Sequence, residues 1–131
     1  MINYFSKYKF IFYFCNIVLI ILYLFPGSLL GCYIYNDCKI QPQITSNYIV
    51  STNHLYAYLV LSIIGFLTYR KNNKFNILII YLIFLSIVLE VLQYFVPNRS
   101  FEFSDLFGNL VGVIIIIILS YLFKVYENFK D

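Results

Sequence analysis

Four long apolar runs, each ended by charged or turn-forming residues, constrain the fold of this chain more than any other feature. They occupy residues 10–25, 55–69, 75–96 and 106–123, and each is long enough to anchor a helix. A helix that crosses a bilayer needs about 20 mainly apolar residues. The sequence therefore predicts an all-α, polytopic membrane protein: a four-transmembrane-helix bundle forming one domain (residues 1–131), with spans at about 8–28, 53–70, 75–96 and 105–124.

The composition excludes several other classes of protein. Charged residues make up only 11% of the chain, against about 25% in soluble domains, which is too few to cover the surface of a small soluble enzyme. Apolar residues at 62% exclude a disordered chain. The net charge of +3 is small and spread along the chain, so we expect no nucleic-acid partner. The lipid bilayer is the expected partner, and the oligomeric state stays open.

The basic residues indicate the orientation of the four predicted spans. Cytoplasmic loops are enriched in lysine and arginine, and this predicts a multi-pass protein of the cell membrane with both termini in the cytoplasm. Residues 26–53 and 97–104 would then face outward, and the first span would stay uncleaved. The predicted cytoplasmic side carries Lys7, Lys9, Arg70, Lys71, Lys74, Lys124 and Lys130, against Lys39 and Arg99 on the other side.

Two of the three cysteines lie close together in the predicted outward loop. Cys32 and Cys38 flank a short polar stretch, whereas Cys15 lies inside the first apolar run. Disulfides persist in oxidising compartments, so Cys32 and Cys38 can pair if this loop faces outward.

Polar residues gather near the predicted outer ends of the second, third and fourth spans. Ionisable groups cost about 2.5–3.5 kcal/mol inside a bilayer and normally face a bundle interior. Glu90 and Gln93, and likewise Asp105 and Asn109, share a helical face by their spacing. We therefore predict one outer pocket made by Glu90, Gln93, Arg99, Asp105 and Asn109, with His54 at its rim.

A purely structural role for the same residues stays open. Arg99 could pair with Glu90 or Asp105, Asn109 could bridge helices, and Asp105 could cap the fourth helix. With one histidine and scattered carboxylates, we expect no metal site and no cofactor. Gly108 and Gly112 form a G-x-x-x-G pattern, which predicts a close helix crossing.

Three segments carry a family resemblance. Residues 89–100 read LEVLQYFVPNRS and residues 104–112 read SDLFGNLVG, giving E-x-x-Q, an aromatic residue, P-x-R, then D-x-x-x-N and a glycine three residues on. Residues 53–59, NHLYAYL, place a tyrosine four positions after a histidine. Together these segments resemble the motifs of VanZ-like membrane proteins. Val50 and Ser51 stand where many members of that family carry an Asp-Lys pair.

The resemblance implies an integral membrane protein of the bacterial cell envelope. The family is named for a protein that confers low-level teicoplanin resistance, so a contribution to glycopeptide resistance is one expectation, with an anionic lipid or lipid-linked wall intermediate in the pocket. The alternative is a small membrane enzyme acting on a phosphorylated lipid, with His54, Glu90 and Asp105 as candidate catalytic residues. A transporter subunit is disfavoured because the sequence resembles no broken-helix pair. Whether the chain is an enzyme stays open.

Overall fold

The computed structural model describes residues 4–70 and 74–131, with side chains from residue 8 onward, and every regular element in this part is a helix. The helices are α1 (Tyr4–Leu24), α2 (Leu29–Tyr35), α3 (Thr52–Tyr69), α4 (Phe75–Gln93) and α5 (Phe103–Lys130). The all-α prediction is confirmed. Lys71 and the side chain of Lys7, which the orientation prediction uses, lie outside this part.

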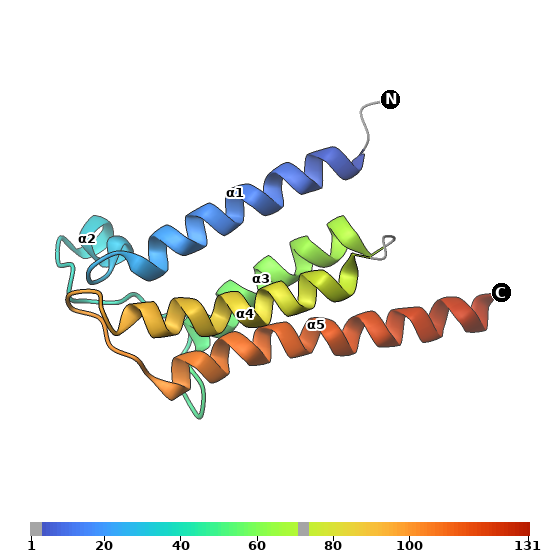
Figure 1. Cartoon of the computed structure of the whole chain (residues 1–131). Helices are drawn as coiled ribbons and strands as arrows, with labels where there is room; N and C mark the ends of the chain where they lie inside the picture. The colour runs from blue at the N-terminus through green and yellow to red at the C-terminus, as the bar shows by residue number, and fades with distance from the viewer. Residues whose placement is uncertain (1–3, 71–73) are drawn as a thin grey trace.

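The four longer helices form an elongated bundle (Figure 1). Helix α5 packs most extensively against α3 and also against α4, while α1 packs against α3 and α4 from the other side. Fully buried residues such as Tyr58, Leu61, Leu82 and Val113 form the core between these helices. The start of α1 and the end of α5 lie at the same end of the bundle, opposite α2 (Figure 1). We call the opposite end, with α2 and the loops 36–51 and 94–102, the α2 end.

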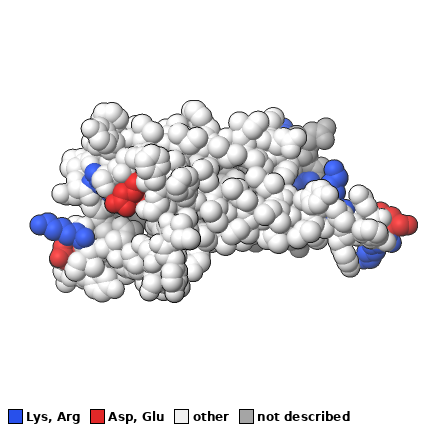
Figure 2. Space-filling view, turned by 90° about the horizontal axis from the view of Figure 1, so that it is seen from below, with Lys and Arg blue, Asp and Glu red and all other residues white. Residues whose placement is uncertain are grey.

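The outside of the bundle is apolar along its length. Ile80, Phe84 and Ile118 are each more than half exposed, and on the face in Figure 2 the charged groups lie towards the two ends. Two helices, α4 and α5, are long and apolar enough to cross a membrane, and the α1–α2 pair is a third candidate if it counts as one bent span. These features indicate a membrane protein. The four-span count remains a prediction, because α3 begins with the polar residues Thr52, Asn53 and His54 and is not among the candidates.

Helix α2 and the bend before it were not expected from the sequence. The predicted first span ran on to residue 28, but α1 ends at Leu24 and the chain bends by 80° before α2. Gly27 adopts a φ of +85° at the bend, a conformation that favours glycine. The expectation of no broken-helix pair is therefore wrong for α1 and α2, because the Pro-Gly turn does not end the helical structure but redirects it. As predicted, Cys32 in α2 is joined to Cys38 by a disulfide.

Two other helix ends also differ from the prediction. Helix α4 ends at Gln93 rather than residue 96, and residues 94–96 form tighter turns with hydrogen bonds to the residue three positions earlier, ahead of Pro97, which has no backbone N–H to donate. Helix α5 continues to Lys130, well past the apolar run that ends at residue 123. A helix that leaves the bilayer can continue in water, so apolar length alone does not set its end.

Gly108 and Gly112 bring α5 against the backbone of α3. A Cβ atom on Gly108 would lie 2.5 Å from the carbonyl oxygen of Ser51, and one on Gly112 would lie 2.8 Å from the oxygen of Leu55. This contact places the first three turns of α5 beside the first two turns of α3. The polar residues near both helix starts are therefore neighbours.

Candidate functional site

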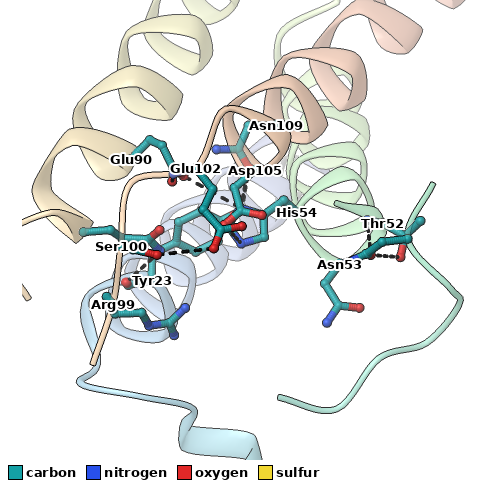
Figure 3. Close-up of polar contacts among 12 residues, drawn as sticks. Tyr23, Thr52, Asn53, His54, Glu90, Arg99, Ser100, Glu102, Asp105 and Asn109 are labelled. Atoms are coloured by element: carbon teal, nitrogen blue, oxygen red, sulfur yellow. Dashed lines mark hydrogen bonds and ion pairs between the residues drawn. The ribbon is translucent and has the colours of Figure 1, made fainter. Parts of the chain in front are cut away.

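Five buried or half-buried polar side chains from four helices meet at the α2 end of the bundle. We call them the polar cluster, and Figure 3 shows them converging between α1, α3, α4 and α5. Glu90 and Asn109 are fully buried and His54 is 8% exposed. The members of the cluster are Tyr23, His54, Glu90, Asp105 and Asn109.

Asn109 lies at the centre of the cluster. Its side-chain oxygen accepts a hydrogen bond of 2.7 Å from the Tyr23 hydroxyl and lies 3.2 Å from Nδ1 of His54. An amide oxygen only accepts hydrogen bonds, so His54 Nδ1 carries the proton in this contact. The tautomer leaves a lone pair on Nε2. The Tyr23 ring packs against the imidazole with 4.7 Å between the ring centroids.

Two carboxylates flank the imidazole of His54. Nε2 lies 3.6 Å from Oδ2 of Asp105, and Nδ1 lies 4.0 Å from Oε2 of Glu90. Oε1 of Glu90 accepts a hydrogen bond of 3.1 Å from the backbone N–H of Glu102. Oε2 is buried and has no hydrogen-bond partner among the residues that the structure describes. One acidic oxygen therefore points into the cluster without a donor.

Gln93 and Arg99 bind the end of α1 rather than the cluster. Gln93 Nε2 donates to the carbonyl of Tyr23 at 3.0 Å, and Arg99 donates from Nε to Phe25 at 3.1 Å and from Nη2 to Leu22 at 2.9 Å. The last carbonyls of a helix lack partners within it, and the bend after Leu24 leaves them accessible. The suggested ion pair of Arg99 with Glu90 or Asp105 is not formed within the described part of the chain.

The guanidinium of Arg99 is only half-buried. Burial lowers the pKa of Arg99, while Asp105, Tyr23 and Glu90 act to raise it. Arginine stays protonated across the physiological range, so this side chain brings a permanent positive charge to the α2 end.

Two cavities meet beside the cluster. The polar cavity has a volume of about 480 Å³, and its charged lining consists of Lys39, Arg99, Glu102 and Asp105. The apolar groove, of about 620 Å³, runs between α1 and α3 beneath α2. The two cavities share a wall that includes His54 and Arg99.

The structure brings most of the predicted pocket residues together, in a different arrangement from the one expected. His54 lies inside the cluster rather than at a rim, whereas Gln93 and Arg99 lie beside it. Sequence reasoning missed Tyr23, because this residue is one of 14 tyrosines in the chain. It also missed the buried hydroxyl of Tyr58, which has no hydrogen-bond partner among the described residues, although the motif at residues 53–59 contains Tyr58.

Apolar helices enclosing a buried His-carboxylate cluster at one end define a small helical membrane protein with a candidate ligand site. The chain matches the model of the VanZ/LLP1 family over residues 3–124, which is nearly its whole length, and it belongs to this family. No curated protein and no solved structure matches the chain.

Proposed function

We propose that the chain is a four-span protein of the bacterial cytoplasmic membrane, with α1, α3, α4 and α5 crossing the bilayer and both termini in the cytoplasm. The start of α1 and the end of α5 lie at one end of the bundle, as an even number of spans requires. Three basic residues lie at the same end, in agreement with the positive-inside rule: Arg70 follows α3, Lys74 precedes α4, and Lys124 lines one pocket with Arg70. The α2 end then faces outward.

We further propose that the α2 end binds an amphiphile with an anionic head group, such as a lipid-linked wall intermediate. The observation that carries this proposal is the shared wall: His54 and Arg99 border both the polar cavity and the apolar groove. The anionic head group would then lie among polar and charged side chains in the polar cavity, and the hydrocarbon chain would lie among apolar side chains in the groove. Arg99, and Lys39 in the same cavity, provide positive charge for a phosphate.

The test is lipid binding by the full chain in detergent, measured by native mass spectrometry. We expect binding of a polyprenyl phosphate, weaker binding of phosphatidylglycerol and no binding of the neutral polyprenol or of inorganic phosphate. Val60→Trp should fill the groove and reduce binding, because Val60 lines it and is exposed. Val91→Trp is the control, since Val91 is similarly exposed on α4 and lines neither cavity. Equal binding of polyprenyl phosphate and polyprenol would refute the proposed role of the head group.

Membership of the VanZ/LLP1 family supports a physiological proposal, namely a contribution to teicoplanin resistance. We expect cells that express the chain to tolerate more teicoplanin than cells with the empty vector. Arg99→Lys should lose this effect without loss of membrane insertion, since lysine lacks the forked donors that reach two carbonyls. Unchanged susceptibility at normal expression would contradict this role.

An enzyme acting on a phosphorylated lipid is the second candidate. It is favoured by the position of His54, which lines the polar cavity and has Asp105 at 3.6 Å and Glu90 at 4.0 Å. Phosphate release from a polyprenyl phosphate would distinguish the two functions. An enzyme should lose nearly all turnover with Glu90→Gln or His54→Asn, whereas a binding protein shows no turnover and loses affinity by degrees.

A further inference from the structure

The geometry points to a binding site for one divalent transition-metal cation between His54, Glu90 and Asp105. One possible ligand atom from each of these side chains lies within 4.8 Å of one from each of the other two. The three residues come from α3, α4 and α5, so the packing of the bundle assembles the set. This proposal departs from the expectation of no metal site. That expectation rested on the sequence, in which the three positions fit no local metal-binding motif.

The distances between the possible ligand atoms are close to those between ligand atoms around a bound ion. Nitrogen and oxygen ligands lie about 2.0–2.2 Å from zinc, so tetrahedral neighbours are about 3.3–3.6 Å apart. Nε2 of His54 and Oδ2 of Asp105 are 3.6 Å apart, which already fits. A possible ligand oxygen of Glu90 lies within 4.8 Å of a ligand atom from each of the other two residues, so the Glu90 side chain would move closer to complete the set.

Asn109 orients the imidazole as the supporting residues of metal sites do. A ligating histidine usually donates its second N–H to a carbonyl or carboxylate, which fixes the tautomer. His54 Nδ1 lies 3.2 Å from the Asn109 oxygen, and the Tyr23 hydroxyl donates to the same oxygen. The lone pair of Nε2 is therefore directed towards Asp105.

An independent observation is the buried, unpartnered oxygen of Glu90. Oε2 belongs to a side chain with 0% exposure and has no hydrogen-bond donor in the described part of the chain. An isolated carboxylate is costly to bury unless it is paired or coordinates a metal. Arg99 forms no ion pair with Glu90 within the described residues, and two of its nitrogens donate instead to α1 carbonyls.

The donor set selects the kind of cation. One imidazole and two carboxylates fit Zn²⁺ or Mn²⁺ better than Mg²⁺, which prefers all-oxygen ligation. His54 and Asp105 line the polar cavity, so the remaining coordination positions would face it. The cavity wall carries two acidic and two basic side chains, and a divalent ion would make it attractive to phosphate. This last consequence rests on the proposed lipid binding; the ion site itself does not.

The test is metal binding by the full chain without added lipid. The protein carries Cys15→Ser to remove the free thiol, is stripped with a chelator and is then dialysed against Zn²⁺ or Mn²⁺ alone. We expect one equivalent of bound Zn²⁺ by elemental analysis, a bound Mn²⁺ signal by electron paramagnetic resonance, and a Zn²⁺-dependent rise in melting temperature. Mg²⁺ should not compete at equal concentration.

Variants locate the ion. Glu90→Gln, Asp105→Asn and His54→Gln should each weaken binding by at least tenfold, and Asn109→Ala by about 10–100-fold. Glu127→Gln, an exposed acid at the far end of α5, should bind as the parent does. Absence of stoichiometric binding by the folded parent would overturn the proposal, as would unchanged binding by the three ligand variants. Because the dialysis contains no lipid, metal binding is measured independently of lipid binding. The metal site could therefore be confirmed even if the protein bound no lipid.

Discussion

At the scale of single residues, Asn109 is the residue on which the order of the polar cluster depends. Its side-chain oxygen contacts both the Tyr23 hydroxyl and the His54 imidazole, so one group fixes side chains from α1 and α3. Apolar substitution would leave two buried donors without an acceptor. Loss of the Tyr23 hydroxyl would remove only one of these two hydrogen bonds and leave the contact between Asn109 and His54 in place.

We therefore predict that substitution of Asn109 destabilises the protein more than substitution of Tyr23. Asn109→Ala should lower the free energy of unfolding by about 1–3 kcal/mol, the cost of leaving buried donors unpaired. Tyr23→Phe should cost less, about 0.6 kcal/mol, as is typical of one hydrogen bond between membrane helices. Tyr94→Phe, at an exposed position, is the control. Reversible unfolding in detergent measures all three, and a larger loss for Tyr23→Phe than for Asn109→Ala would contradict the arrangement.

The site could be predicted from sequence only in part, and the reasons are physical. Glu90, Asp105 and Asn109 stood out because polar groups are costly within apolar helices. The partners of Arg99 could not be foreseen, because they are backbone carbonyls that become accessible only through the bend after Leu24. Likewise the role of Tyr23 depends on how α1 packs, and no local pattern encodes that packing.

At the scale of helices, the contact between α3 and α5 determines where the side chains of His54 and Asp105 lie. Gly108 and Gly112 face backbone atoms of α3, which cannot rotate away as a side chain can. Gly65 offers a contrast, since a Cβ there would meet side-chain atoms of Leu78 and Phe12. The G-x-x-x-G pattern was visible in the sequence, but its partner helix was not.

We therefore predict unequal effects of three glycine substitutions. Gly108→Ala and Gly112→Ala should each lower the free energy of unfolding by about 1–3 kcal/mol through overpacking. Gly65→Ala should cost less, because the side chains of Leu78 and Phe12 can adjust, whereas backbone atoms of α3 cannot; the gain of about 1 kcal/mol in helix propensity is common to all three variants. Thermal unfolding of the three variants, prepared in the same detergent, checks the order. Equal losses would indicate that the α3–α5 crossing is looser than the structure implies.

The disulfide in the α2 region gives a prediction about the environment of that element. Cys32 and Cys38 are joined and Cys15 is free, and structural disulfides persist in oxidising compartments. Denatured, unreduced protein from cells should react with one maleimide per chain, and with three after reduction. Labelling of all three cysteines before reduction would place α2 in a reducing compartment.

At the scale of the whole molecule, the charge distribution and the chain path agree. The acids and bases in view lie towards the two ends of the bundle (Figure 2), and α5 ends at the end where α1 begins (Figure 1). The all-helical architecture followed from the four apolar runs. The bend that creates α2 did not, because a Pro-Gly pair can either end a helix or redirect it.

Topology is tested with reporters. A green fluorescent protein fused after Lys130 should be fluorescent, and alkaline phosphatase fused at the same point should be inactive. The reverse should hold for fusions within residues 41–47, between Cys38 and α3. An externally active reporter at the C-terminus would reverse the orientation that we propose.

The groove between α1 and α3 has a consequence for how any ligand would arrive. Phe14 and Val60, both more than half exposed, lie along it, so in the orientation that we propose it opens sideways onto the surrounding lipid. An amphiphile could enter by lateral diffusion within one leaflet, without its hydrocarbon chain passing through water. Occupancy would then follow the mole fraction of the ligand in the membrane, and a modest intrinsic affinity would be enough for a scarce molecule.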